Sequence, residues 1–161
     1  MANVFSKKPV VLTRGKGALV WDIHGKEYVD CTSSYGVALL GHCHPKVVAA
    51  VKAQAEQLIS CHSGFYNDQR AEFVQKLVQI TPKGLDKVFL SNSGAESVEC
   101  AIKLARKATG KTEIIALMGA FHGKTMGALS ATWDRKYREP FQPLIPDIKH
   151  VPPDNPDKVG S

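Results

Sequence analysis

The sequence contains no apolar run that approaches the roughly 18 residues needed to cross a bilayer. Residues 1–11 lack the basic, apolar and small-residue order of a secretion signal. No CxxC pair is present, and the four cysteines lie in apolar or helical stretches, as reduced thiols commonly do: Cys31, Cys43, Cys61 and Cys100. We therefore expect a cytoplasmic protein with free thiols and no membrane partner.

The chain also lacks the repeated interleaving of basic and aromatic residues that a base-stacking groove requires. Its net charge of +6 would otherwise suit a nucleic-acid partner. The basic residues fall near one expected helix and in one short segment: Lys103, Arg106, Lys107 and Lys111, then Arg135, Lys136 and Arg138. We interpret both groups as solvated faces and expect no nucleic-acid partner.

What is present is typical of a globular protein. The 161 residues are enough to bury roughly 70% of the unfolded surface. Hydrophobic residues make up 43% and charged residues 22%, near the averages for globular domains. There is no internal repeat, so function has to be argued from local motifs.

Residues 18–31 have the pattern of a β-hairpin, with two β-rich segments on either side of a turn at His24 and Gly25. From Pro45 the apolar period changes to that of an amphipathic helix, carried by Val47, Val48, Val51, Ala55 and Leu58. Pro45 suits the first helical turn because its missing N–H would have no partner there. We expect a hairpin followed by a helix.

Helical and strand patterns alternate in the next part of the chain. They predict a helix over 68–80 capped by Asp68, a strand over 87–91, a helix over 93–109 and a strand over 113–118. A strand, a helix and a second strand form a right-handed crossover unit of a parallel sheet. Beyond Phe121 the chain is rich in proline and shows no closing element. The sequence reads as a segment that stops partway through a larger α/β sheet.

Residues 92–96, Asn-Ser-Gly-Ala-Glu, join the first of these strands to its helix. Ser93 and Glu96 have the spacing of a capping box, which fixes the start of the helix. The first helical amides have no intrahelical partner, the helix dipole is positive there, and Gly94 lets the backbone approach an anion. In parallel sheets ligands bind beyond the carboxyl ends of strands. We interpret this turn as a phosphate site, with a merely well-capped helix as the alternative.

Residues 119–125, Gly-Ala-Phe-His-Gly-Lys-Thr, follow the second strand and are expected at the same edge of the sheet. A planar cofactor that carries a phosphate needs an anion cradle and a stacking surface nearby, and Phe121 or His122 offers that surface. Lys124 is a candidate to meet a substrate carboxylate. Considered alone, Phe121 would be a core aromatic and His122 a satisfied polar residue. The neighbouring anion turn favours the cofactor interpretation.

These two motifs, together with YVDCTSSYGV at 28–37 and LGHCHP at 40–45, closely resemble the class-III aminotransferases. That family includes ornithine, acetylornithine, 4-aminobutyrate and putrescine aminotransferases, and the resemblance covers residues 9–152. It implies the α/β fold of the fold-type I pyridoxal-phosphate transferases, of which this chain would hold the first part. Residues 1–60 would then be the β-hairpin and helix of the small domain. Residues 61–161 would begin a mostly parallel three-layer α/β/α large domain.

The resemblance also implies a cofactor, pyridoxal 5'-phosphate. In the family the Ser-Gly-Ala turn holds the cofactor phosphate, which assigns Ser93, Gly94 and Ala95 to that role. The Phe of Phe-His-Gly stacks on the pyridine ring, which assigns Phe121, with His122 in the same cofactor site.

Two further positions are assigned to the substrate by the same resemblance. Tyr35 would line the substrate entrance, and Lys124 stands where the family commonly has an Arg that grips a substrate carboxylate. Arg offers a planar bidentate fork and Lys a single point charge, so this difference is not conservative. The string Phe-His-Gly-Lys looks more like the putrescine and some ornithine-type members, which weakens an assignment to acetylornithine.

The family reaction moves an amino group from a donor, often at a terminal carbon, to 2-oxoglutarate, with the cofactor as electron sink. The Schiff-base Lys and its Asp and Glu partners lie in the later half of the family pattern, and no lysine here stands in the matching context. We therefore expect an N-terminal fragment of an enzyme, inactive alone, with no catalytic residue of its own and a homodimer when complete. The alternative is a non-catalytic domain of that family that binds a phosphate ligand or a partner.

A cluster of metal-ligating residue types deserves a separate interpretation: His42, Cys43, His44, Cys61 and His62. The paired cysteine spacings of a closed zinc site are absent. We interpret Gly-His-x-His-Pro as the turn that leads into a helix, and we expect no metal.

Overall fold

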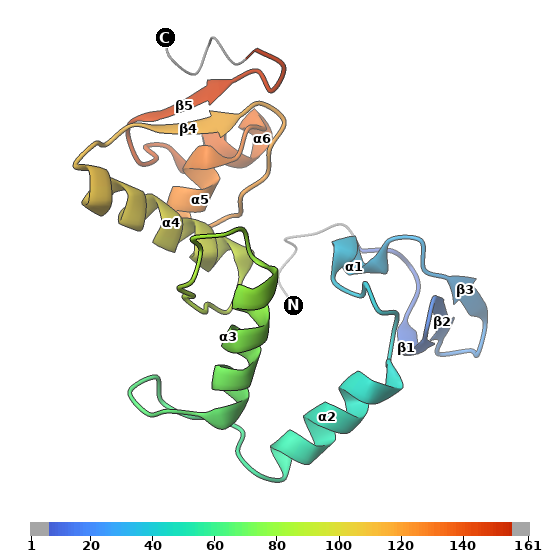
Figure 1. Cartoon of the computed structure of the whole chain (residues 1–161). Helices are drawn as coiled ribbons and strands as arrows, with labels where there is room; N and C mark the ends of the chain where they lie inside the picture. The colour runs from blue at the N-terminus through green and yellow to red at the C-terminus, as the bar shows by residue number, and fades with distance from the viewer. Residues whose placement is uncertain (1–6, 156–161) are drawn as a thin grey trace. The chain divides into compact units, whose positions relative to one another are not determined.

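The computed structural model describes residues 7–155. The chain divides into two compact units, Met1–Phe73 and Val74–Ser161, which are described separately here (Figure 1). The assignment of residues 1–60 and 61–161 to a small and a large domain stays a prediction. Among residues 7–155 no helix has both the length and the apolar character needed to cross a membrane.

The first unit opens with an antiparallel sheet of three strands in the order β1-β2-β3. The strands are β1 (Leu12–Lys16), β2 (Leu19–Asp22) and β3 (Glu27–Val29). The predicted hairpin is confirmed by the β2–β3 pairing, in which Val20 lies opposite Tyr28. The sheet also contains β1, which the sequence pattern did not predict.

Asp22 holds the hairpin turn together. Its Oδ1 accepts hydrogen bonds from the amides of His24 and Lys26, both at 2.9 Å, and its Oδ2 accepts one from the Tyr28 hydroxyl at 2.8 Å. These bonds lower the pKa of Asp22 although burial opposes the charged form. Gly25 adopts a positive φ of 82° in this turn, as its lack of Cβ allows.

Three helices follow: α1 (Ser33–Gly36), α2 (Pro45–Ala55) and α3 (Asp68–Ile80). The predicted helix start at Pro45 is confirmed. Asp68, predicted as the cap of α3, is instead its first helical residue. Asn67 precedes it, and its side-chain oxygen accepts from the Arg70 amide at 2.9 Å. The prediction was wrong by one position because Asn and Asp cap helices equally well.

The second unit contains the long helix α4 (Gly94–Thr109) and two parallel strands, β4 (Ile114–Leu117) and β5 (Ile148–Val151). Between the strands come α5 (Met126–Ala131), α6 (Arg135–Arg138) and the 3-10 turn η1 (Glu139–Phe141). Figure 1 shows α5 between α4 and the strand pair. Helix α4 ends as expected at Gly110, which adopts a left-handed φ of 70°.

Residues 87–91 were predicted as a strand, and this prediction was wrong for the described residues, where the segment pairs with no other strand. A β-strand requires a hydrogen-bonding neighbour, and an apolar pattern specifies only the side chains. The crossover that does form runs from β4 through α5 to β5. β5 lies in the proline-rich segment, for which no strand was predicted.

The core of the second unit lies around α5. Its buried residues come from α4, α5 and both strands: Ile102, Ala116, Ala128, Leu129, Ala131 and Val151. On α5 itself the buried residues are small except for Leu129, so this helix can approach the neighbouring elements closely. Arg106 fastens the end of α4 to this core by donating to the carbonyls of Thr112 and Pro146, both at 2.8 Å.

Candidate functional site

The start of α4 is fixed by the capping box that the sequence predicts. Ser93 has an extended backbone, and its Oγ accepts a hydrogen bond from the Glu96 amide at 3.2 Å. In return Glu96 Oε2 accepts one from the Asn92 amide at 2.6 Å. Because these bonds satisfy amides on either side of the turn, the helix begins at a sharply defined point.

The next two amides are left open. Within residues 7–155, the amides of Gly94 and Ala95 have no hydrogen-bond acceptor. A Cβ added to Gly94 would meet no atom within 4 Å, so the space in front of the helix start is free. Two unpaired amides at the positive end of a 16-residue helix form an environment that stabilises an anion.

The second predicted turn lies directly against the first. A Cβ built on Gly123 would fall 2.7 Å from the Cβ of Ala95 and 3.1 Å from its Cα. Since real Cβ atoms do not come so close, only glycine fits here, and Gly123 also has a positive φ of 139°. The Ser-Gly-Ala and Phe-His-Gly turns are therefore neighbours at the start of α4, as predicted.

Phe121 presents its ring beside this position. Its side chain is 58% exposed. One edge contact supports it: the Tyr137 ring lies 5.8 Å away at an interplanar angle of 75°. Lys124 Nζ lies 5.7 Å from the centroid of the same Tyr137 ring. The ring of Phe121 thus has a support and a largely accessible surface.

His122 is placed differently from its neighbour. It is half-buried and contributes to a cavity of about 300 Å³ whose other walls are apolar residues of α4, β4 and α5. Phe121 is therefore the more exposed aromatic residue of this turn. The predicted participation of His122 in a cofactor site stays a prediction.

Glu99 links α4 to α5, a role that the sequence analysis did not identify. Its Oε1 accepts from the amides of Gly127 at 2.8 Å and Ala128 at 3.2 Å. Hydrogen bonds from the Thr125 side chain and these two amides, with the nearby charge of Lys103, lower the pKa of Glu99 against the effect of burial. The available signal was its position one turn after the capping box, on the face of α4 that meets α5.

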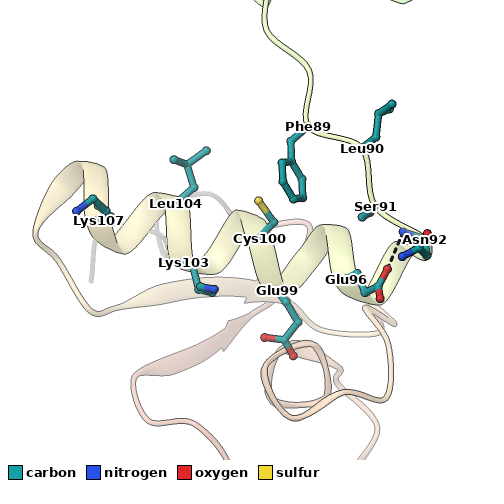
Figure 2. Close-up of a pocket in the computed structure, with 10 residues that line it drawn as sticks. All are labelled: Phe89, Leu90, Ser91, Asn92, Glu96, Glu99, Cys100, Lys103, Leu104 and Lys107. Atoms are coloured by element: carbon teal, nitrogen blue, oxygen red, sulfur yellow. Dashed lines mark hydrogen bonds between the residues drawn. The ribbon is translucent and has the colours of Figure 1, made fainter. Parts of the chain in front are cut away.

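A groove of the second unit borders this site, with Asn92 and Glu96 in its lining. It has a volume of about 590 Å³ and runs along α4 beside the unpaired segment 87–91 (Figure 2). Phe89 and Cys100 face each other across it, and Leu104 lies further along the helix. Its lining does not include Gly94, Ala95 or Phe121. We interpret it as a packing surface next to a strand-like segment.

Tyr35 belongs to the first unit, in the short turn α1. Ser33, Ser34 and Tyr35 all have positive φ angles, of 48°, 51° and 58°. Consecutive left-handed residues with side chains are unfavourable, and such strain is found most often at functional sites. The Tyr35 side chain is fully exposed. Its assignment to a substrate entrance stays a prediction.

The same turn is anchored by a hydrogen bond between the side chains of Asp30 and His42. Asp30 Oδ2 lies 2.8 Å from His42 Nε2, and Asp30 Oδ1 accepts from the amides of Thr32 and Ser33. The hydrogen bonds from the Thr32 hydroxyl and from His42 lower the pKa of Asp30 to about 2. His42, considered in the sequence as a possible metal ligand, is instead paired with a carboxylate.

Across residues 7–155 no group of three or more His, Cys, Asp or Glu side chains is arranged to hold a metal ion. All four cysteines are free thiols, as expected from their spacing.

Comparison with known proteins extends this description. The family model for class-III aminotransferases matches residues 1–161. The chain is 57% identical to an acetylornithine aminotransferase of Methanopyrus kandleri, with 93% of this chain and 39% of that protein aligned. It is 51% identical to the LysW-aminoadipate semialdehyde transaminase of Deinococcus radiodurans, covering 93% of this chain and 35% of that protein.

Solved structures agree with the fold. The crystal structure of ornithine aminotransferase from Toxoplasma gondii superposes with a TM-score of 0.88 at 33% identity, over 96% of this chain and 38% of that one. A second structure of that enzyme, with a TM-score of 0.87 and 33% identity over 95% of this chain and 37% of that one, has partial occupancy of pyridoxal phosphate at its active site. The predicted fold class, a hairpin and helices followed by the start of a parallel α/β/α layer, is confirmed. The chain thus spans less than two fifths of the length of these relatives, and it belongs to the class-III aminotransferase family.

Proposed function

We propose that this chain supplies the phosphate-binding and ring-stacking turns of an aminotransferase that uses pyridoxal 5'-phosphate. The observation that carries the proposal is the contact between Gly123 and Ala95, which brings Phe121 next to the open start of α4. A phosphorylated aromatic cofactor needs an anion site and a stacking surface close together. Neither turn alone would distinguish such a cofactor from a simple phosphate ester.

The residues present fit the phosphate of that cofactor. The amides of Gly94 and Ala95 would donate to the phosphate, and the Ser93 hydroxyl would donate a further hydrogen bond while its oxygen keeps capping the helix. The open space in front of Gly94 would admit the phosphate without a steric clash. When bound, pyridoxal phosphate supplies the electron sink for amino-group transfer.

Phe121 would hold the plane of the pyridine ring. The edge-to-face contact with Tyr137 would fix the orientation of the Phe121 ring and leave one of its faces available for stacking. Lys124 extends from the same turn, and we propose that its ammonium group attracts the carboxylate of a substrate. Tyr35 would contribute to the substrate entrance, as the family resemblance implies.

For the reaction, we propose transfer of an amino group to 2-oxoglutarate from a donor that carries a terminal amine. The names of two relatives, acetylornithine aminotransferase and LysW-aminoadipate semialdehyde transaminase, support a donor with an amino-acid backbone blocked at its α-amine. The presence of Lys124 had favoured a putrescine or ornithine type instead. The relatives, at 57% and 51% identity, carry more weight than one side chain, and we propose an acetylornithine-type donor.

The active protein would be a cytoplasmic homodimer larger than the two units described. Large apolar side chains are exposed on the second unit, among them Phe89, Leu104 and Leu117. Parallel sheets normally have both faces covered, so these residues require further packing partners.

Binding of pyridoxamine 5'-phosphate tests the proposal, since this form has no aldehyde to react with surface lysines. We expect its fluorescence to change on titration with the 161-residue chain and saturate. Pyridoxamine, which lacks the phosphate, and ribose 5-phosphate, which lacks the ring, should bind at least about tenfold more weakly, because each loses one of the two turns. Equal affinity for ribose 5-phosphate would favour the non-catalytic phosphate-binding domain instead.

A further inference from the structure

The Phe-His-Gly turn is held from beneath by one buried hydroxyl group. Thr132 follows α5 directly and is 1% exposed. Its Oγ1 accepts hydrogen bonds from the amides of His122 at 3.0 Å and Gly123 at 3.3 Å. It lies 3.1 Å from the carbonyl oxygens of both Gly123 and Ala128, to one of which it donates. A hydroxyl has one donor and two acceptor positions, so this oxygen is fully used.

The residue after it holds the other side of the turn. The Trp133 amide donates to the carbonyl of Ala120 at 2.9 Å. Residues 120, 122 and 123 are therefore all bonded to the two residues that follow α5, and Phe121 is the exposed residue of the run 120–123. The position of the Phe121 ring depends on a backbone that Thr132 fixes.

The same hydroxyl sets the distance between the two turns. Gly123 contacts Ala95 on one side and bonds to Thr132 on the other. A shift of Gly123 toward α4 is blocked by Ala95, and a shift away would break its bonds to Thr132. The separation between the open amides of α4 and the stacking ring is thus determined from both sides.

We propose that Thr132 is a positioning residue for the cofactor ring: its hydroxyl holds Phe121 at the distance from the Gly94 and Ala95 amides that a phosphorylated pyridine ring requires. This inference rests on the proposed function. Because Thr132 is 1% exposed, it would act through Phe121 and would not touch the cofactor. The loss of its hydroxyl should therefore affect binding of the ring and leave binding of phosphate alone unchanged.

Three variants of the 161-residue chain separate this role from general stability. Thr132→Val keeps the shape and removes the hydroxyl, and Thr132→Ser keeps the hydroxyl. Ser130→Ala is the matched control: Ser130 is buried on α5, two residues before Thr132, and its Oγ bonds to Met126 and Ile145, outside the Phe-His-Gly turn. All three are compared at a temperature where thermal unfolding shows them folded.

We expect Thr132→Val to weaken the binding of pyridoxamine 5'-phosphate by about tenfold. Its affinity for inorganic phosphate should stay within about twofold of that of the original chain. Thr132→Ser and Ser130→Ala should each keep the affinity for pyridoxamine 5'-phosphate within about twofold. Equal losses for both ligands in Thr132→Val, or a loss in Thr132→Ser as large as in Thr132→Val, would overturn the positioning role.

Hydrogen exchange on the ligand-free chain provides a second measurement. The amides of His122 and Gly123 should be protected in the original chain and in Thr132→Ser, and should exchange at least about tenfold faster in Thr132→Val. Unprotected amides in the original chain would overturn the inference even where Thr132→Val does not fold.

The two proposals fail in distinguishable ways. Absence of any pyridoxamine 5'-phosphate binding by the original chain contradicts the proposed function, and with it the role of Thr132 toward that cofactor. Binding by the original chain that is unchanged in Thr132→Val contradicts the role of Thr132 alone.

Discussion

The backbone of Gly123 lies against Ala95 so closely that a Cβ on Gly123 would fall 2.7 Å from the Ala95 Cβ. Through this contact a turn near the middle of the second unit meets the start of α4, and a phosphate site becomes the neighbour of an aromatic ring.

Gly123→Ala should destabilise the chain and weaken cofactor binding together. The added methyl group overlaps Ala95 and Ala128, and a positive φ of 139° is strained for alanine. We expect a loss of about 1–3 kcal/mol in the free energy of unfolding, measured with urea. Gly94→Ala is the control: its methyl group meets no atom within 4 Å, so stability should be retained while pyridoxamine 5'-phosphate binds more weakly. Equal stability of the two variants would contradict the close approach.

Ser93 has two separable roles, in the capping box and toward the phosphate. Ser93→Ala removes the acceptor for the Glu96 amide and should cost about 1 kcal/mol of stability. Ser93→Asp restores an acceptor and should recover that stability, but its carboxylate would repel the phosphate. We expect Ser93→Asp to be as stable as the original chain by thermal unfolding and to bind pyridoxamine 5'-phosphate more weakly than Ser93→Ala. Tighter binding by Ser93→Asp than by Ser93→Ala would contradict a phosphate site at the start of α4.

Glu99 should make the joint between α4 and α5 sensitive to acid. Its pKa is lowered in the folded chain, first by the Thr125 hydrogen bond, so its contribution is fully present above the ordinary value of 4.5 and is lost as the pH falls below it. Glu99→Ala leaves the amides of Gly127 and Ala128 without their acceptor and should cost about 1–2 kcal/mol at pH 7. The difference in free energy of unfolding between the original chain and Glu99→Ala should be smaller at pH 3 than at pH 7. An equal difference at both pH values would show that the charge of the Glu99 carboxylate does not contribute to stability.

Asp30 should also make the stability of the first unit depend on pH, over a lower pH range than Glu99 does. Its pKa is lowered from 3.8 to about 2 by Thr32 and His42, so the stabilisation it provides is present above about pH 4 and is lost toward pH 2. Asp30→Asn should remove this part of the acid response, as followed by hydrogen exchange of residues 30–42 between pH 5 and pH 2. His42→Gln is the companion variant. Each single variant removes the contact between Asp30 and His42, whereas the double variant removes it only once. We therefore expect the double variant to lose less free energy of unfolding than the sum of the losses of the two single variants.

Much of this architecture could be predicted because the signals are local. The capping box at Ser93 and Glu96, the glycine that ends α4 and the proline that begins α2 depend on a few neighbouring residues, and all three are confirmed. The proximity of the two turns was predicted from two adjacent parallel strands. The Gly123–Ala95 contact confirms it, although residues 87–91 before the first turn form no strand in the described part of the chain.

The features that were missed depend on partners distant in sequence. Residues 87–91 have the composition of a strand and no hydrogen-bonding neighbour in the described part of the chain, whereas Ile148–Val151 pairs with β4 despite its proline-rich surroundings. Glu99 and Thr132 read as ordinary helix and loop residues in the sequence. Their roles arise from bonds to residues 9 to 29 positions away.

The most direct test of the cofactor site is an NMR titration of the isotope-labelled chain with pyridoxamine 5'-phosphate, which follows each backbone amide separately. The account predicts that the amides of Gly94 and Ala95 and those of Phe121 and Gly123 shift along one saturation curve, with no comparable change in residues 30–42. Shifts confined to one of the two turns, or centred on the groove lined by Phe89 and Leu104, would contradict it.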